Sequence, residues 1–492
     1  MKQRGTSKIL TLARKVFTNP VILYVISRYG TYIIQFVNSF FIAVYLGPYF
    51  LGIWGFINLV IGYMAQFNFG ISQSVNLIIS VKKQDEEYVK KIIGNGMSMI
   101  FCLSLVIIIF FLFNKIGIIQ IGNKYNLQDY IFPIAIIAVL THVNSMFSNV
   151  FRVFGKIHAI AINQSLYPVL VLLVIPFFRE ERLLWAILLT NCISFFISFV
   201  LFLLQSPVKI KLFFEWKFIK YIQVTGWYLF IYNTSFHLIL LSTKSFISNN
   251  YSVSEFGYFT FSYSLANAVF LLLNSISFLI FPKMLNRFAT LSNKQIINIL
   301  TSVRTSYISF SHLLVHFVIM IFPLILYFFP AYEESSSVFK LTALTLILYT
   351  NSFGFQGVLM ANGKEKLIGL IAFGAFMLNL LLSAILVYIV NVSFHYVILS
   401  TLLTYFIYVN IISKIGRYIL EMSSSFFPTL QDAFPWRMMV PFILSLFLIL
   451  TKMEDILLVV PFFIYVFLNQ LDLRKIRGLI AKIIKNPNLI NI

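Results

Sequence analysis

Two positive charges stand inside otherwise apolar segments of the chain. Arg28 lies in residues 21–46, which contain no acidic residue, and Lys244 lies in a second apolar segment, residues 218–247. A charged side chain at the centre of a membrane helix costs at least ~2.5–3.5 kcal/mol, so such residues face a polar interior or a partner. Guanidinium and ammonium groups bind phosphate and carboxylate oxygens. The two residues therefore predict a binding device for an anionic ligand.

Amide and imidazole side chains accompany these cations along the same segments and beyond. Because an unpaired polar group in hydrocarbon is costly, turning all of them toward one water-accessible cavity is the most favourable arrangement. An alternative stays open from the sequence: Arg28 could snorkel to the cytoplasmic interface, and Lys244 to the outer surface. The predicted substrate-binding residues are Arg28, Lys244, Gln35, Asn38, Gln66, Asn68, Asn233, His237 and Asn351.

The segments that carry these residues belong to a long series of apolar runs. The 492 residues are 60% apolar and only 11% charged, whereas soluble proteins are about 45–50% apolar and about 25% charged. Runs of ~20 apolar residues span a bilayer as helices. About fourteen such helices are predicted, at residues 21–46, 51–80, 92–114, 130–151, 159–178, 183–205, 218–247, 256–282, 305–329, 337–361, 367–390, 394–413, 436–451 and 456–471.

The second half of the chain weakly repeats the first. Shifted by 205 positions, Gly52 falls on Gly257 and Phe56 on Phe261. An even number of spans per half permits a parallel repeat about an axis along the membrane normal. The predicted fold is an all-α membrane protein with two parallel-repeat six-helix bundles plus a C-terminal helix pair. Its predicted parts are a cytoplasmic tail (1–20), an N-terminal half (21–205), a basic connector (206–220), a C-terminal half (218–413), the helix pair (436–471) and a basic cytoplasmic tail (472–492).

The net charge of +21 follows the membrane topology rather than a nucleic-acid partner. With the N-terminus in the cytoplasm, the inner loops and tails carry 29 of the 37 Lys and Arg residues, and the outer loops carry six. This asymmetry obeys the positive-inside rule and predicts that both termini are cytoplasmic. The basic N-terminus lacks the apolar core and cleavage site of a signal peptide. Interleaved lysines and aromatics in the connector predict an amphipathic helix at the interface.

No pattern for catalysis, metal binding or a cofactor stands out. The closest string to a P-loop, GVLMANGKE from Gly357, has the wrong spacing and final residue. The predicted outer loops are short and lack clustered carboxylates, so general acid–base chemistry is not indicated. His312 and His316 lie one helical turn apart, as a hydrogen-bonded structural pair or a pH-sensitive one. The chain is therefore predicted not to be an enzyme, with no catalytic residue, metal or cofactor.

Three stretches of the sequence resemble the polysaccharide flippases called Wzx, which belong to the same broad superfamily as MurJ and the MATE exporters. The first runs from Ser27-Arg28 through Leu46-Gly47-Pro48 to Gly52. The second is Asn68-Phe69-Gly70-Ile71-Ser72. The third runs from Lys244 through Phe256-Gly257-Tyr258 to Phe281-Pro282-Lys283. Arg28 also resembles a cavity arginine of the MurJ branch, whereas Thr243 stands where relatives often have Asp.

The resemblance implies a flippase in the bacterial cytoplasmic (inner) membrane. Its substrate would be an undecaprenyl-diphosphate-linked oligosaccharide repeat unit for O-antigen or capsule. Arg28, and with it Lys244, would neutralise the diphosphate while the lipid tail stays in the bilayer. Transport would proceed by alternating access through a central cationic cavity, with H⁺ or Na⁺ as a possible coupling ion.

Two other functions stay open at this point. A MATE-like exporter of small molecules would share the architecture, although a cationic cavity without acids does not suit cationic drugs. A membrane polymerase or ligase of the same polysaccharide pathway would require chemistry that the sequence does not display.

Overall fold

A computed structural model describes residues 20–476 of the chain, and this described part is helical without a β-strand. The predicted tail over residues 1–20 lies outside the described residues apart from its last position, as does 477–492 of the predicted C-terminal tail. Two compact units divide the chain, Met1–Phe230 and Ile231–Ile492. The all-α class predicted from the apolar runs is confirmed.

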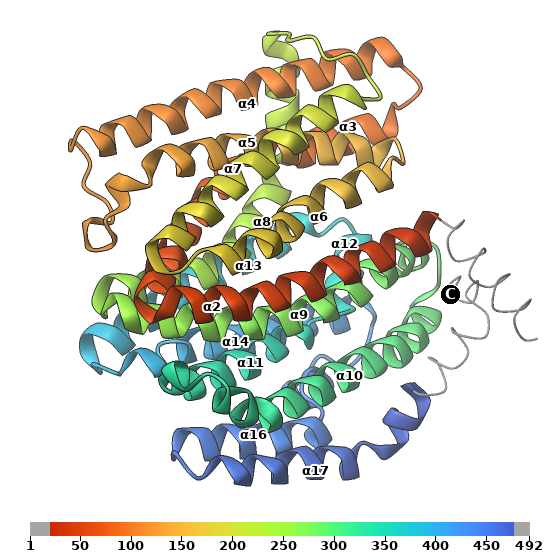
Figure 1. Ribbon diagram of the computed structural model, residues 1–492. Helices are drawn as coiled ribbons and strands as arrows, with labels where there is room; N and C mark the ends of the chain where they lie inside the picture. Colours follow the sequence, from red (N-terminus) through yellow and green to blue (C-terminus); the bar gives the residue numbers. More distant parts are fainter. Residues whose placement is uncertain (1–19, 477–492) are drawn as a thin grey trace, which may run out of the picture. The chain divides into compact units, whose positions relative to one another are not determined.

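The N-terminal unit consists of long helices joined by short turns (Figure 1). Helix α5 packs against both α4 and α7, and α6 packs against α2 and α7. The helices are α2 (Pro20–Gln66), α3 (Ile71–Val81), α4 (Glu86–Lys115), α5 (Ile131–Val153), α6 (Ile157–Val174), α7 (Glu180–Leu204) and the first part of α8 (Trp216–Asn250), with turns η1 (Asn123–Tyr125), η2 (Leu127–Asp129) and η3 (Ile175–Phe177).

Helix α2 contains a break that separates the first two predicted spans. Gly47 has φ 70° and ψ 168°, a backbone conformation that residues with a Cβ rarely adopt. Pro48 follows it and lacks the N–H that would continue the hydrogen-bond ladder. The turn predicted at Gly47-Pro48 is therefore present, and α2 is two helical segments, 20–46 and 48–66.

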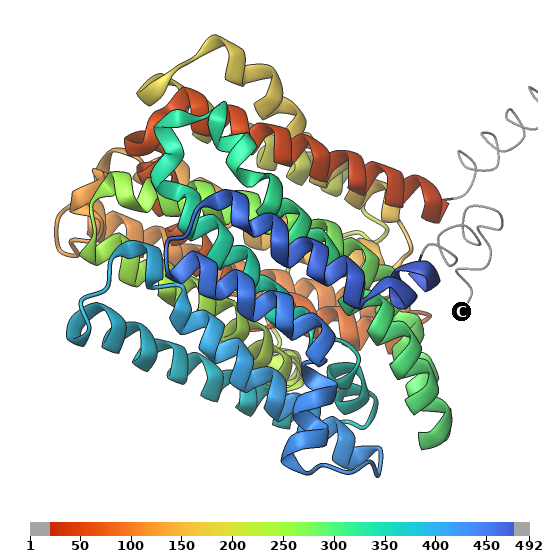
Figure 2. The same cartoon turned by 90° about the horizontal axis from the view of Figure 1, so that it is seen from below.

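The C-terminal unit contains the rest of α8 and the remaining helices. Helix α11 packs against α9, α10 and α14, and Figure 2 shows the dark-blue pair α16 and α17 side by side. The helices are α9 (Val253–Phe288), α10 (Asn293–Tyr327), α11 (Ser336–Thr350), α12 (Phe355–Ala361), α13 (Glu365–Ala384), α14 (Leu399–Ile419), α15 (Phe426–Ala433), α16 (Trp436–Leu450) and α17 (Val459–Leu468), with turns η4 (Pro330–Ser335), η5 (Ile385–Ile389), η6 (Phe394–Tyr396) and η7 (Asp455–Leu458).

Every predicted span coincides with one or more of these helices. Eight helices of the described chain are individually long and apolar enough to cross a membrane, and three bent pairs raise the number to as many as eleven. One bent pair joins 330–350 to Phe355–Ala361 at an angle of 41°. By the length and composition of its helices, the chain is a multi-pass membrane protein.

One local prediction is wrong. Residues 206–215 of the connector are not helical, and α8 begins only at Trp216. The Asn95 side chain of α4 accepts a hydrogen bond from the Glu215 backbone N–H at 2.6 Å. The connector is therefore an irregular segment that is hydrogen-bonded to α4. Its contact with this helix outweighs the amphipathic pattern of lysines and aromatics.

Helix α4 has an apolar surface that faces outward from the N-terminal unit. Its exposed large side chains recur about every helical turn, as a stripe along one face. An exposed apolar stripe of this length would be a liability in water, whereas lipid tails solvate it. The stripe consists of Phe101, Leu105, Val106, Ile109, Leu112 and Phe113.

Candidate functional site

The N-terminal unit encloses an open-sided cavity of about 400 Å³, within the size range of small-molecule sites. Four helices, α2, α5, α6 and α7, supply its walls. Among the described residues, its lining is mostly hydroxyls, amides and aromatic rings, with Arg28 as the one charged residue and no carboxylate. The lining comprises Arg28, Thr31, Tyr32, Gln35, Thr141, Asn144, Ser145, Ser148, Ala161, Asn163, Gln164, Tyr167, Pro168, Phe195, Ser198 and Phe202.

All four helices contribute from the same end of the unit. The lining lies near the N-terminal ends of α2 and α6 and near the C-terminal ends of α5 and α7. Since an α-helix rises ~1.5 Å per residue, Arg28 lies about 12 Å along the axis from the start of α2. The cavity is therefore a pocket inside one half of the helix bundle rather than a surface groove along its length.

Arg28 is half-buried in the N-terminal part of α2, and its side chain is oriented by a residue of the same helix. Its Nε donates a hydrogen bond to the Tyr32 hydroxyl at 2.7 Å, one turn further along. The guanidinium carbon also lies 5.6 Å from the centre of the Tyr32 ring. Among the lining residues, this arrangement leaves the cavity with a fixed positive group and no fixed negative group.

Hydrogen bonds between helices hold the walls of the cavity together. The hydroxyls of Thr31 on α2 and Ser165 on α6 lie 2.6 Å apart. Asn38 is buried and donates its amide N–H to the backbone carbonyl of Pro168, on α6, at 2.8 Å. Of the predicted residues, Arg28 and Gln35 therefore line the cavity, and Asn38 braces its wall from behind.

Two further predicted residues, Gln66 and Asn68, lie at the break between α2 and α3. The Asn68 side chain closes this turn on itself: its oxygen accepts from the Gly70 N–H at 2.8 Å, and its amide donates to the Ala65 carbonyl at 3.2 Å. Neither residue lines the cavity. The polar character of Asn68, which the sequence allowed to be read as substrate-binding, is explained by the turn itself.

Lys244 lies on α8, in the C-terminal unit, and does not line this cavity. Its ammonium nitrogen is 3.4 Å from the centre of the Tyr263 ring, on α9. In the described residues no acidic side chain lies within ion-pair distance of Lys244, and the face of the Tyr263 ring stabilises the ammonium group. On the same helix, Asn233 is half-buried and His237 is exposed.

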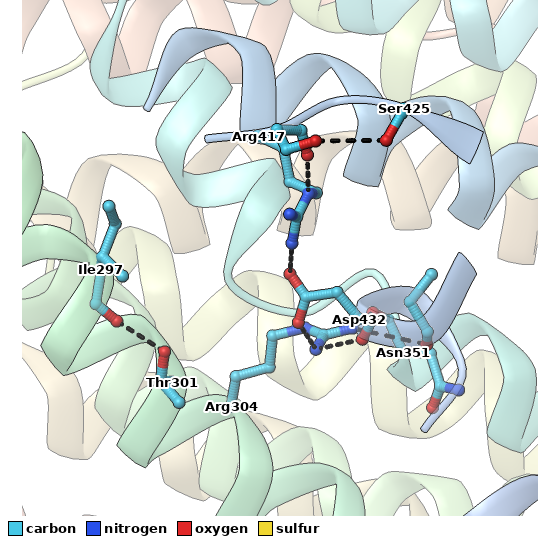
Figure 3. A network of polar contacts seen from close by, with 9 residues as sticks. Ile297, Thr301, Arg304, Asn351, Arg417, Ser425 and Asp432 are labelled. Atoms are coloured by element: carbon cyan, nitrogen blue, oxygen red, sulfur yellow. Dashed lines mark hydrogen bonds and ion pairs between the residues drawn. The ribbon is translucent and has the colours of Figure 1, made fainter. Parts of the chain in front are cut away.

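Asn351, the last predicted residue, belongs to an ionic network in the C-terminal unit (Figure 3). Its backbone carbonyl accepts from Arg304 Nη2 at 2.8 Å, and its side chain lies 3.4 Å from the His312 ring. Arg304 also donates Nη1 to the Asp432 carbonyl at 2.7 Å and to its carboxylate at 3.4 Å. Arg417 donates to the other carboxylate oxygen of Asp432 at 2.7 Å.

Sequence reasoning missed this network. Arg304 was counted in a cytoplasmic loop because the predicted span began at residue 305, yet α10 starts at Asn293 and leaves Arg304 only 5% exposed. Asp432 lies on α15, a short helix between two spans, 128 positions away from Arg304. One signal was available in the sequence. Ser292 and Gln295 form a capping-box pattern that starts a helix, and this start would have placed Arg304 eleven positions inside the helix.

The histidine pair of α10 is structural. His312 and His316 are both buried, and the His316 Nδ1 lies 3.3 Å from the Ser445 hydroxyl of α16. Their rings lie 6.3 and 5.6 Å from the ring of Tyr465, on α17. These contacts connect α10 to α16 and α17. Within residues 20–476 no group of three or more His, Cys, Asp or Glu side chains could hold a metal ion.

The fold is similar to that of several helical membrane proteins with solved structures. An inward-facing MATE-family multidrug resistance transporter of the MOP superfamily superposes with a TM-score of 0.67 and 13% identity, over 81% of this chain and 98% of the transporter.

The second match is the lipid II flippase MurJ in an inward closed conformation. It superposes with a TM-score of 0.66 and 15% identity, over 93% of this chain and 100% of that one. A MOP-superfamily transporter from Pyrococcus furiosus matches with a TM-score of 0.52 and 12% identity, over 81% of this chain and 93% of that one. No family profile matches the sequence. No curated protein matches it either. At these identities the likeness establishes the fold.

Proposed function

We propose that this protein is a flippase that moves an undecaprenyl-diphosphate-linked oligosaccharide from the inner to the outer leaflet of the bacterial cytoplasmic membrane by alternating access. The observation that carries the proposal is the cavity of the N-terminal unit, where Arg28 stands among hydroxyls and amides and no carboxylate of the described residues lines the wall. Such a wall replaces water around a sugar, while the guanidinium neutralises a phosphate.

The position of the cavity suits uptake from the cytoplasm. Arg152 and Lys156, which join α5 to α6, lie at the end of the unit where the cavity is. By the positive-inside rule this basic end is cytoplasmic. A lipid-linked sugar is made at that face of the membrane, so its diphosphate would meet Arg28 without first crossing hydrocarbon.

The shared fold adds support of a general kind. The solved proteins with this fold are described as a lipid II flippase and as multidrug transporters, and neither description is of an enzyme. MurJ is matched over the larger share of this chain, 93% against 81%. We therefore propose a carrier without a catalytic step, in which binding and release of the lipid-linked sugar are the whole cycle.

The test is transport by purified protein in proteoliposomes loaded with an undecaprenyl-diphosphate-linked oligosaccharide. The Arg28→Ala variant should transport about 10- to 100-fold more slowly, since a hydrogen bond to a charged group contributes about 1.5–3 kcal/mol. Arg28→Lys, which keeps the charge but not the bidentate geometry, should fall between the two. Arg152→Ala, which removes an exposed arginine of the same unit, is the control and should transport normally. Full transport by Arg28→Ala at wild-type protein levels would refute the proposed phosphate contact.

A second candidate is an exporter of small molecules, favoured by the match to a MATE-family transporter. Such an exporter of cations would place its cargo beside Arg28, which repels it. Competition decides between them: an exporter would be inhibited by small organic cations, whereas the proposed flippase would be inhibited by soluble diphosphate esters.

A further inference from the structure

The connector between α7 and α8 packs one of its sides against the N-terminal unit. Val208 and Ile210 pack against a buried apolar cluster to which α3, α4 and α5 contribute. Gly94 of α4 allows a close approach: a Cβ added there would lie 2.2 Å from the Lys211 carbonyl oxygen and 2.4 Å from Phe213 Cδ2. These contacts determine which side of the connector faces inward and which faces outward.

The outward side carries large apolar side chains. Leu212, Phe214 and Trp216 are 64%, 70% and 72% exposed. Three such side chains within five residues would be unfavourable in water, and an exposed apolar surface of this kind marks a contact with another molecule. The nature of that molecule follows from the depth and the charge of the connector.

The connector lies over the face of α4 that is apolar and exposed further along the helix. Gly94 precedes Phe101, the first residue of the exposed stripe, by seven positions, and two helical turns return to the same face. At ~1.5 Å per residue the two lie ~10 Å apart along the axis. This depth corresponds to the headgroup layer next to the hydrocarbon of a membrane.

Lysines surround the exposed apolar side chains. Glu215 is the one acidic residue in the stretch 209–220, and it is accompanied by four exposed lysines, Lys209, Lys211, Lys217 and Lys220. Within residues 20–476 none of these lysines forms an ion pair. A lysine at this depth lays its methylene groups along apolar surface and extends its ammonium group to the level of the lipid phosphates.

We propose that the outward side of the connector, together with residues 216–220 of α8, is a docking surface for anionic phospholipids. The four lysines bind the phosphate groups, and the three exposed apolar side chains insert between neighbouring headgroups. A lysine near an anionic membrane surface strengthens binding about fivefold. None of these residues lines the cavity that contains Arg28, so the docking surface is independent of the cargo.

Other occupants fit this surface less well. A zwitterionic lipid would accommodate the apolar side chains but would bring no net negative charge to four lysines. A second copy of the chain, packed by the usual two-fold symmetry, would place the same lysines against each other. A soluble protein would have to reach the headgroup layer and displace the lipid there.

The first experiment measures lipid contact at Trp216. The chain has five tryptophans, and the substitutions Trp54→Phe, Trp185→Phe, Trp227→Phe and Trp436→Phe leave Trp216 alone. The protein is reconstituted in bilayers of phosphatidylglycerol and phosphatidylcholine, with one or the other lipid brominated, because bromine quenches tryptophan fluorescence on contact. Comparison of the two series should give a preference for phosphatidylglycerol of about fivefold or more, which falls as salt is added.

The second experiment removes the charge of the docking surface in the same protein. The variant carries Lys209→Gln, Lys211→Gln, Lys217→Gln and Lys220→Gln. Its preference for phosphatidylglycerol should fall below about twofold, while quenching by the two lipids together persists.

The matched control is the variant with Lys90→Gln and Lys91→Gln. These two lysines belong to α4, the helix that holds the connector, and each is already paired with a glutamate one turn earlier at 3.3 Å. The preference at Trp216 should therefore stay within twofold of its original value. A loss as large as that of the four-lysine variant would mean that general surface charge, and not the docking surface, selects the lipid.

The remaining outcomes also decide. Equal quenching by the two lipids before any lysine is changed would refute the preference for anionic lipid. Quenching by acrylamide in the water, with none by either lipid, would refute the membrane contact and favour a soluble partner.

Should the single-tryptophan protein fail to fold, amide hydrogen exchange of the unaltered chain in bilayers decides. Adding phosphatidylglycerol to phosphatidylcholine should slow exchange in residues 209–215 about fivefold or more, and unchanged exchange would refute the proposal. Since none of these experiments measures transport, such a failure leaves the flippase proposal standing.

Discussion

The two units hold Arg28 and Arg304 in different surroundings. In the N-terminal unit, Arg28 stands half-buried beside an open-sided cavity whose lining, among the described residues, contains no carboxylate. In the C-terminal unit, Arg304 is 5% exposed and donates to one carboxylate and three backbone carbonyls. An arginine that the protein pairs with its own carboxylate and carbonyls holds the fold, whereas an arginine beside an open cavity is accessible to a ligand.

A neutral cluster of the C-terminal unit is likewise paired within the protein. The Asn379 amide of α13 donates to the Ile239 carbonyl at 2.8 Å and lies 3.0 Å from the hydroxyls of both Ser242 and Thr243 on α8. The Thr243 hydroxyl in turn lies 2.8 Å from that of Thr401 on α14. These side chains are buried, and their hydrogen bonds join three helices rather than lining a space.

The largest effect is expected from breaking the ionic network of Arg304, Asp432 and Arg417. In Asp432→Ala, Arg304 and Arg417 lose their shared carboxylate, and leaving a buried charge unpaired costs about 3–5 kcal/mol. Asp432 is 31% exposed, so we expect about 3 kcal/mol, measured as the free energy of unfolding of the purified protein in detergent.

The control for Asp432→Ala is a variant of the arginine in the N-terminal cavity. Arg28→Ala should change the free energy of unfolding by less than about 1 kcal/mol, because the arginine already faces a polar, open-sided space. A loss as large for Arg28→Ala as for Asp432→Ala would show that both arginines are structural, and the contrast between the units would fail.

The fold was largely predictable because hydropathy and span length act locally. The fourteen apolar runs and the Gly47-Pro48 turn depend on consecutive residues, and each of them coincides with helices of the described chain. The connector was predicted wrongly because its conformation depends on a distant partner, Asn95 of α4. Local pattern and tertiary contact compete there, and tertiary contact prevails.

The candidate site was predictable only in part, for a related reason. A charge in an apolar run identifies Arg28, and helical spacing adds Gln35, which lies two turns further along the same face of the helix. Asparagines, by contrast, look alike in sequence whether they close a turn, as Asn68 does, or join two helices, as Asn38 does. Which atom of an amide is engaged depends on helix packing, and no spacing rule reports it.

A smaller effect is expected at the break between α11 and α12, beside the network. Gly354 has φ +91°, and a Cβ added there would lie 2.4 Å from Leu300 Cδ1. Gly354→Ala should therefore lower the free energy of unfolding by about 2 kcal/mol, through backbone strain and the contact with Leu300. Gly363→Ala has a similar φ of +66° with open space around it, so it measures the strain alone and should cost less. Equal losses in the two variants would mean that Leu300 yields freely and that this end of the network is loosely packed.

The smallest effect sharpens the contrast between the two cations, Arg28 and Lys244. The Lys244 ammonium lies 3.4 Å from the centre of the Tyr263 ring, and a partly desolvated cation–π contact contributes about 1–2 kcal/mol. Tyr263→Leu should lower the free energy of unfolding by about this amount, whereas Tyr263→Phe, which keeps the aromatic face, should be nearly neutral. If Lys244 is held by the ring as a structural group, Lys244→Met should also leave transport within about twofold of wild type while Arg28→Ala slows it. Loss of transport in Lys244→Met with unchanged stability would instead make Lys244 a second substrate-binding cation, as the sequence predicts.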